Sequence, residues 1–420
     1  MTSPASGREP ALEVLNDLHE QAQFCAPYEL AGLVARCARR LGARTATAYL
    51  ADLQQQELLA LVDPVVSADD DPLPALSIDA TLAGRAYQTG QRQLQGDDGP
   101  WRTWWVPLLM GTSRLGVLGV EVDADTLDNE LLVGLTGLAA AAASLLAAKS
   151  PFGDTLVRLR RRNTLGLASE MQYAILPPLT FTNRSVSVSA ALEPCYEVAG
   201  DTIDYAVDDG RARVGIFDGM GHGMHSAQCA VFTVVAYRNA RRRGLTLTET
   251  LLSIDAALAT GLGGEVFTTA VLADLDTRTG LLQWVNAGHP APLLLRGGKL
   301  IRPLDTEPRP PLGLGHLLAD QPPVPAQEQL EPDDLVLFYT DGVVEARSPD
   351  GEFFGVERLA ELVVRHLAGG LTPPETMRRV VRELLAHHVD QLTDDATLLM
   401  LEWRSTRTAP PQPAESSQEG

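Results

Sequence analysis

The sequence predicts an α+β fold in two domains, and three observations lead to that prediction. At 420 residues with 45% hydrophobic content, the chain is too long for one ordinary core and can bury two. In residues 11–150, helical patterns precede short strand patterns and then a long apolar helix, an order that indicates packed layers of helix and sheet. In the second half of the chain, strand and helix patterns alternate.

Charge and cysteine usage narrow the class of protein. The 34 basic and 54 acidic side chains give a formal charge of −20, which disfavours binding to nucleic acid or to an anionic membrane. The expected partners are proteins, cations and small molecules. The four cysteines have no paired spacing, and residues 1–10 lack the apolar stretch of a secretion signal. A cytoplasmic protein is therefore expected.

The N-terminal domain is predicted over residues 11–150, after a disordered tail at residues 1–10. Apolar residues at helical spacing predict two helices between Ala11 and Arg40. Short strands are predicted at 45–50, 57–62, 104–109 and 115–122. The last element is an Ala-rich helix from Leu131 to Ala148, whose small side chains are too weakly hydrophobic for a bilayer span. We therefore predict a helix packed in the core, and no membrane segment.

Three segments of this domain carry a resemblance: Asp79–Tyr87, Trp105–Leu108 and Arg114–Val120. Together they resemble the GAF family of sensor domains. The resemblance implies a pocket for a small-molecule ligand or a relay that forms dimers, and no residue identifies the ligand. Trp101, Trp104 and Trp105 could line such a pocket, although packing in a core or an interface is the more common role of clustered tryptophans.

A linker helix is predicted over residues 151–178, and Pro177 and Pro178 end it. Its apolar residues alternate in steps of four and three: Phe152, Leu156 and Leu159, then Leu167, Met171 and Ala174. This spacing is typical of a seam that pairs with a second copy, so a homodimer through the linker is one interpretation. A simple amphipathic linker is the other, since Asn163 and Gly166 interrupt the repeat.

The C-terminal half places acidic residues at strand ends and in turns. Strands are predicted at 186–192, 213–217 and 334–339, with a helix at 224–243 and a last strand that opens near residue 397. The carboxylates next to these strands are Asp201, Asp218, Asp341 and Asp394. Asp218 enters a glycine-rich turn, in which the glycines permit positive φ and let the carbonyl of Gly219 approach an ion. A single Asp-Gly pair usually marks only a turn, so the prediction depends on all four together.

Carboxylates gathered without balancing Lys or Arg repel one another, and hard divalent cations relieve that repulsion. Oxygen ligands suit Mg²⁺ or Mn²⁺, whereas zinc prefers Cys or His at suitable spacing. Two such ions about 4 Å apart can acidify a water for in-line attack on a phosphoryl group. The predicted chemistry is hydrolysis of a phosphoester without a covalent intermediate on the enzyme.

The motifs resemble the metal-dependent type 2C (PPM-type) phosphatases, in their bacterial SpoIIE and RsbU-like branch, over residues 179–403. The matching stretches are Ala199–Asp201, Asp218–Gly223, Phe267–Ala270, Asn286–Pro292, Pro311–Leu314, Tyr339–Ala346 and Asp394–Thr397, after a lead-in helix at Met171–Pro178. A disordered tail is predicted at 404–420. The resemblance implies an α/β/β/α sandwich of two antiparallel sheets flanked by helices. Ala199, where this branch commonly has Gly, and Thr202-Ile203, in a slot that is often aromatic, depart from the pattern.

The resemblance also implies the roles of residues. Asp201 and Asp218 would be shared ligands of two divalent cations, Mn²⁺ or Mg²⁺, beside the Gly219 carbonyl, and Asp341 and Asp394 would complete the site. Asp395 is the less favoured member of its pair. Other residues are not assigned to the site. For His222 and His225, capping or substrate contact is favoured over zinc binding, and His289 is expected to be a structural turn residue. Glu197, Asp204 and Glu345 are expected to be solvated, and the basic run Arg238–Arg243 is expected to interact with the helix end and solvent.

The predicted function is hydrolysis of phosphoserine or phosphothreonine on a protein, under control of the N-terminal sensor. By resemblance, the substrate would be an anti-sigma-factor antagonist. A second hypothesis is a catalytically weak scaffold that binds a phosphoprotein in a signalling switch, although the presence of all four carboxylates disfavours it. A third is a sensor whose phosphatase half stays locked until the geometry of a dimer changes.

Overall fold

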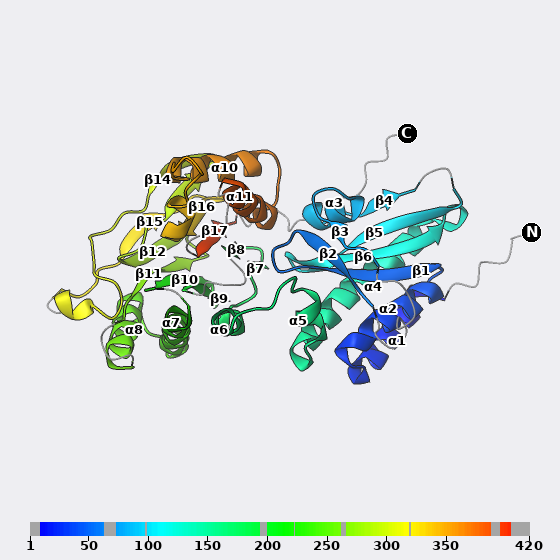
Figure 1. Cartoon of the computed structure of the whole chain (residues 1–420), viewed down its shortest axis with the longest axis horizontal. Helices are drawn as coiled ribbons and strands as arrows, with labels where there is room; N and C mark the ends of the chain where they lie inside the picture. The colour runs from blue at the N-terminus through cyan, green and yellow to red at the C-terminus, as the bar shows by residue number, and fades with distance from the viewer. Residues whose placement is uncertain are drawn as a thin grey trace, which may run out of the picture. The chain divides into compact units, whose positions relative to one another are not determined.

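The computed structural model describes residues 9–62, 73–96, 99–193, 200–221, 223–261, 266–318, 321–387 and 395–404 (Figure 1). The chain divides into two compact units, the first reaching Asn163 and the second beginning at Thr164. The tails expected at residues 1–10 and 404–420 lie almost entirely outside the described residues.

The N-terminal unit is a six-stranded antiparallel sheet with helices on both faces. Its strand order is β3-β2-β1-β6-β5-β4. The strands are β1 Thr45–Ala51, β2 Glu57–Leu61, β3 Leu76–Ser77, β4 Gln93–Gln95, β5 Trp101–Met110 and β6 Ser113–Asp123. The helices are α1 Ala11–Phe24, η1 Pro27–Glu29, α2 Leu30–Arg40, α3 Leu82–Thr89, η2 Ala124–Thr126 and α4 Asn129–Lys149. Helices α1, α2 and α4 share one core with the sheet, and α3 shares a second core with its other face. The expected strands and helices of this unit are confirmed.

Helix α4 packs against the sheet along one side. Its inner face contributes Leu135, Leu138 and Leu146 to the core, and Gly134 lets α1 and the Leu41 side chain approach closely. The segment Asn129–Phe152 is long and apolar enough to cross a membrane, a test that core helices of soluble proteins also pass. The packed inner face agrees with the predicted core helix.

The tryptophans of β5 alternate between the two faces of the sheet. Trp105 is buried on the α3 side, where it packs edge-on against Tyr49 and donates from its indole nitrogen to Gln95 Oε1 at 2.7 Å. Trp104 packs against the core shared with α1, α2 and α4. Trp101 is more exposed and lies under the guanidinium of Arg44. Packing therefore explains these side chains without a shared pocket.

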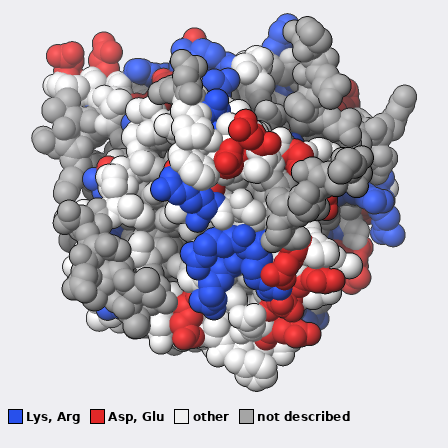
Figure 2. All heavy atoms as spheres, turned by 90° about the vertical axis from the view of Figure 1, so that its right-hand side faces the viewer, with Lys and Arg blue, Asp and Glu red and all other residues white. Residues whose placement is uncertain are grey.

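Charges of both signs are mixed on the face drawn in Figure 2. Both blue and red groups appear on that face, and the central basic group borders acidic ones. Such a surface lacks the large field of one sign that favours nonspecific binding of nucleic acid.

The single linker helix predicted at 151–178 is wrong. The segment instead forms η3 Ser150–Phe152, α5 Thr155–Leu159 and α6 Leu167–Ile175, with non-helical residues around Asn163 and Gly166. Leu156 is buried in the core of the N-terminal unit, whereas α6 packs against α7 of the C-terminal unit. Phe152 and Leu167 are 80% and 67% exposed. The expected seam is therefore divided, because Leu156 is buried in the N-terminal unit whereas Phe152 and Leu167 are exposed.

The C-terminal unit is a sandwich of two antiparallel sheets between two pairs of helices (Figure 1). One sheet has the order β15-β12-β11-β10-β9 and the other β14-β13-β16-β17-β8-β7. The strands are β7 Thr180–Thr182, β8 Val186–Glu193, β9 Asp201–Asp208, β10 Arg211–Gly219, β11 Thr268–Asp276, β12 Leu281–Ala287, β13 Leu293–Arg296, β14 Lys299–Pro303, β15 Ala326–Gln329, β16 Leu335–Tyr339 and β17 Ala396–Trp403. The helices are α7 Met224–Arg242, α8 Leu247–Gly261, η4 Gly315–Leu318, α9 Asp341–Val344, α10 Val356–Ala368 and α11 Pro373–His387. The predicted α/β/β/α architecture is confirmed.

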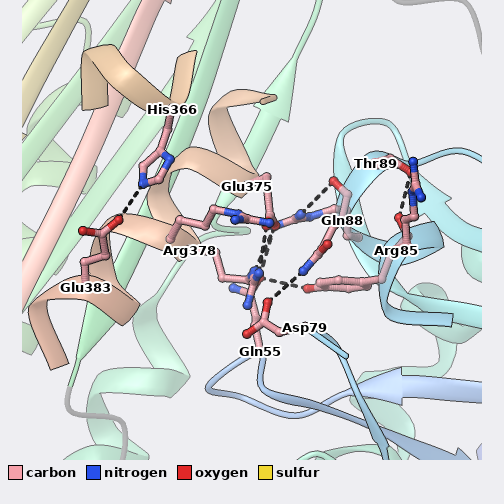
Figure 3. A network of polar contacts seen from close by, with 12 residues as sticks. Gln55, Asp79, Arg85, Gln88, Thr89, His366, Glu375, Arg378 and Glu383 are labelled. Atoms are coloured by element: carbon pink, nitrogen blue, oxygen red, sulfur yellow. Dashed lines mark hydrogen bonds and ion pairs between the residues drawn. The ribbon is translucent and has the colours of Figure 1, made fainter. Parts of the chain in front are cut away.

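Three cores hold these layers together. One lies between the sheets, one between α7, α8 and the five-stranded sheet, and one between α10, α11 and the six-stranded sheet. Polar contacts add to the α10–α11 layer: His366 Nε2 lies 3.1 Å from Glu383 Oε1, and Arg378 pairs with Glu375 one turn away (Figure 3). Strand alternation assigns each face, so Ile216 points to the opposing sheet and Phe217 to the helices.

Candidate metal centre

The hairpin of β9 and β10 brings two of the predicted carboxylates together. Asp209 and Gly210 have φ values of 49° and 75°, as a two-residue hairpin turn of this twist requires. The register that follows pairs Asp201, the first residue of β9, directly with Asp218 near the end of β10. A turn of two residues thus sets which acidic side chains meet at the far end of the hairpin.

Asp201 lies in an acidic and dry environment. Its side chain is 2% exposed, and burial raises the pKa of the carboxyl well above its usual range, with further increases from Asp395 and Asp218. The hydroxyls of Thr340 and Thr397 oppose this rise in pKa by hydrogen bonding. Since both charged neighbours are acidic, a bound cation would relieve the strain on this group.

Hydrogen bonds from three segments fix Asp201. Thr340 Oγ1 donates to Asp201 Oδ2 at 2.6 Å. Asp395 Oδ2 accepts from the backbone N–H of Gly200 and, at 3.1 Å, from that of Asp201. Gln172 on α6 donates its side-chain amide to the Asp201 carbonyl. These contacts hold Asp201 in one orientation, and Asp395 accepts from the main chain of Gly200 and Asp201.

Asp341 and Asp394 are placed less directly. Asp341 follows Thr340 and begins α9, where it is partly buried. Thr340 and Thr397 exchange hydrogen bonds, at 3.1 Å between main chains and 2.9 Å to the Thr340 hydroxyl, so β17 and the start of α9 meet at Asp201. Asp394 lies outside the described residues. Among the residues that the structure describes, no three His, Cys, Asp or Glu side chains converge as metal ligands, and the full ligand set stays a prediction.

The glycine-rich turn after β10 is shaped by close packing. A Cβ on Gly219 would lie 3.1 Å from the Ser226 carbonyl oxygen and 3.3 Å from that of Gly200. The Gly219 N–H donates to the Gly200 carbonyl at 3.0 Å. Gly221 and Gly223 have φ values of 88° and 71°, which glycine adopts at little cost. The turn therefore needs glycine at each of these positions, and at Gly219 the reason is space.

Gly219→Ala is expected to weaken Mn²⁺ binding and to lower the free energy of unfolding by about 1–3 kcal/mol, because the added methyl group pushes apart the strand ends that carry Asp201 and Asp218. Manganese titration and urea unfolding measure the two effects. Gly244→Ala is the control, because Gly244 has a φ of 72° and open space around it at the end of α7. Equal Mn²⁺ binding by both variants would contradict the prediction.

The histidines have separate environments. His225 is exposed in the first turn of α7, and His222 lies outside the described residues. His289 is 7% exposed, and burial lowers its pKa to about 3. Its ring nitrogen Nδ1 lies 2.7 Å from Thr269 Oγ1. The side chain of Asn286 bonds to both the N–H and the carbonyl of His289, which supports its predicted role in the turn.

The expectation that Asp204 is solvated is wrong, because the residue is buried. Its side chain is 1% exposed and pairs with Arg238 at 2.7 Å and Arg241 at 2.9 Å. Arg238 also donates to the Ile175 carbonyl at the end of α6. These arginines were expected to serve the helix end and solvent, but they neutralise a buried charge instead. Their spacing of three residues on a helix facing the strand of Asp204 was the available signal.

Comparisons with known proteins point to one family. The family described as "Stage II sporulation protein E (SpoIIE)" matches residues 208–404. Phosphoserine phosphatase RsbU of Bacillus subtilis is 22% identical over 240 residues, which cover 57% of this chain and 70% of RsbU. Phosphoserine phosphatase RsbP of the same organism is 26% identical over 204 residues, which cover 45% of this chain and 47% of RsbP. The chain therefore spans about half the length of RsbP.

A solved structure, the SiaA-PP2C domain of Pseudomonas aeruginosa, is 22% identical with a TM-score of 0.47, over 61% of this chain and 99% of that domain. The match of the SpoIIE family covers most of the sandwich, from the end of β9 to β17. It includes Asp218, Gly219, Asp341 and Asp394, whereas Asp201, the other carboxylate of the predicted set, precedes the matched residues. Most of the C-terminal unit of this chain is thus similar in sequence to the SpoIIE family.

Proposed function

We propose that the chain hydrolyses phosphoserine or phosphothreonine on a protein substrate with the help of two divalent cations, Mn²⁺ or Mg²⁺. The observation that carries the proposal is the pairing of the buried Asp201 with the half-buried Asp218 on neighbouring strands, with Asp395 as a further acidic neighbour of Asp201. The names of RsbU and RsbP, both phosphoserine phosphatases, support the same reaction class.

The donor set fits hard cations. Asp201, Asp218, Asp341 and Asp394, with the carbonyl of Gly219, would offer only oxygen ligands, which Mg²⁺ and Mn²⁺ prefer. When bound, such ions would acidify an attacking water and neutralise the phosphoryl oxygens. The chain's own groups orient the ligands: Thr340 fixes one oxygen of Asp201, and the packed Gly200–Gly219 contact sets the spacing of the strand ends.

The partner, the regulation and the cellular location belong to the same proposal. By its resemblance to the RsbU-like branch, the substrate would be a phosphorylated anti-sigma-factor antagonist in the cytoplasm. The N-terminal unit would act as the GAF-like sensor, with a small-molecule ligand that remains to be identified. A homodimer through residues 151–178 is not part of the proposal, because the divided helices leave no continuous seam.

Phosphate release from a phosphoserine protein tests the proposal. The full chain is expected to release phosphate with Mn²⁺ and to stop in EDTA. The same assay is applied to a fragment of residues 164–404. This fragment includes α6 because Gln172 on that helix bonds to the main chain of Asp201. Release from neither protein would favour the scaffold hypothesis. A fragment more active than the full chain would favour a sensor that locks the enzyme.

A further inference from the structure

We infer that Thr269 and His289 form a positioning pair for Asp218, and that cation binding at the candidate metal centre depends on this pair. The inference rests on the proposed function, since it concerns the metal that the proposal requires. Neither residue belongs to the expected ligand set. Thr269 lies on β11, which pairs with β10, and His289 lies in the turn after β12. Through Thr269, the pair reaches the carboxylate that the hairpin register places opposite Asp201.

The first link joins Thr269 to Asp218. Thr269 lies on β11 directly opposite Asp218 of β10, and its Oγ1 is 3.4 Å from Asp218 Oδ2. Strand alternation directs the neighbouring Thr268 elsewhere: its hydroxyl lies 3.0 Å from Cys229 Sγ and 3.2 Å from Thr233 Oγ1, under helix α7. Of these two adjacent threonines, Thr269 is the one whose hydroxyl contacts the Asp218 carboxylate.

The second link joins Thr269 to His289. The distance from Thr269 Oγ1 to His289 Nδ1 is 2.7 Å, shorter than the link to Asp218. The turn that carries His289 is fixed independently of the ring, because Asn286 bonds to the main chain of His289 on both sides at 2.7 and 2.8 Å. The ring is therefore held against the hydroxyl by a rigid support.

A hydroxyl has one proton to donate, so the order of the chain matters. If Nδ1–H donates to Thr269 Oγ1, the hydroxyl proton is directed to Asp218 Oδ2, and each bond strengthens the next. This order engages Oδ2 and so fixes the orientation of the Asp218 carboxylate. The low pKa of His289 keeps the ring neutral, so that it adds no positive charge to compete with a metal ion.

Hydrogen-bonded partners of metal ligands affect binding strongly. Their removal typically costs about 10–100-fold in metal affinity or activity, because they orient the ligand. Thr269→Val keeps the shape of the side chain but removes the hydroxyl. We expect it to weaken Mn²⁺ binding by about 10–100-fold. Thr269→Ser restores the hydroxyl and should bind Mn²⁺ as the wild type does, which a purely structural role of the side chain would not produce.

The test is a titration of the full chain with Mn²⁺, with free Mn²⁺ read from its electron paramagnetic resonance signal, and thermal unfolding in EDTA checks the fold of each variant. Thr268→Val is the matched control, because it removes a buried hydroxyl from the next residue on the same strand. Weaker binding by Thr269→Val but not by Thr268→Val or Thr269→Ser supports the inference. Wild-type binding by Thr269→Val overturns it.

If Thr269→Val does not fold, His289→Phe decides, because it removes the ring nitrogens while Asn286 still holds the turn. Weaker Mn²⁺ binding by this variant supports the inference, and unchanged binding overturns it. A wild type that binds no Mn²⁺ would overturn the proposed function and the inference together. A wild type that binds Mn²⁺ and releases phosphate, beside variants that bind equally well, would overturn the inference alone.

Discussion

Asp218→Asn is expected to lower Mn²⁺-dependent phosphate release by more than about 100-fold while the chain stays folded. Loss of a hydrogen-bonded partner of a metal ligand costs up to about 100-fold, so loss of the charge of a proposed shared ligand should exceed that figure. Asp218 faces Asp201 across the β9–β10 hairpin, and asparagine keeps its shape but removes its charge. Initial rates over a range of Mn²⁺ concentrations measure the loss and show whether more metal restores it.

Unfolding in EDTA separates this effect from damage to the fold. Asp218 is one of two acidic groups that raise the pKa of the buried Asp201 carboxyl. Removing its charge relieves repulsion, so metal-free Asp218→Asn should unfold at the same temperature as the wild type or higher. Asp208→Asn, at the exposed end of the neighbouring strand β9, is the control and should keep full activity. Similar losses of activity in both variants would contradict the assignment of Asp218 as a metal ligand.

The carboxylates were predicted because their signals are local, and the hairpin, which was not among the predicted elements, also has a local signal. Asp209-Gly210 marks a two-residue turn between alternating strands, and each acidic residue stands beside a strand that the pattern predicts. The family motifs then selected Asp201 and Asp218 from many acidic side chains, and the register pairs these two. Asp394 was predicted from the same kind of signal and lies outside the described residues.

Features that depend on tertiary contacts were predicted poorly. The helical spacing of residues 151–178 is real, yet Leu156 and the buried face of α6 belong to different units. Asp204 follows Asp201 by only three residues, and nothing local tells that α7 lies over it with two arginines. Thr269 and His289 are 20 residues apart in sequence, so their contact depends on how β11 and the turn after β12 are placed. The hydrophobic pattern of the sequence predicts the helices and strands, whereas tertiary packing decides which side chains contact one another.

Asp204→Ala is expected to lower the free energy of unfolding of the C-terminal unit by about 3–5 kcal/mol, because it leaves two guanidinium groups without their counter-ion in a largely buried place. The Asp204 side chain is 1% exposed, and Arg238 and Arg241 contact its two oxygens separately. Urea unfolding measures the change. Hydrogen exchange should rise in peptides from β9 and α7 and stay unchanged in the sheet of the N-terminal unit.

Two further variants decide whether unpaired charge is the cause. Glu328→Gln breaks the more exposed pair with Arg302, and exposed pairs contribute about 0–1 kcal/mol, so its effect should be small. The combined variant Asp204→Leu, Arg238→Met and Arg241→Met removes all three charges. It should be more stable than Asp204→Ala, because apolar replacement of a whole buried ion pair is often neutral or favourable. If it is as unstable as Asp204→Ala, the loss comes from packing and from the bond of Arg238 to Ile175, and charge is not the cause.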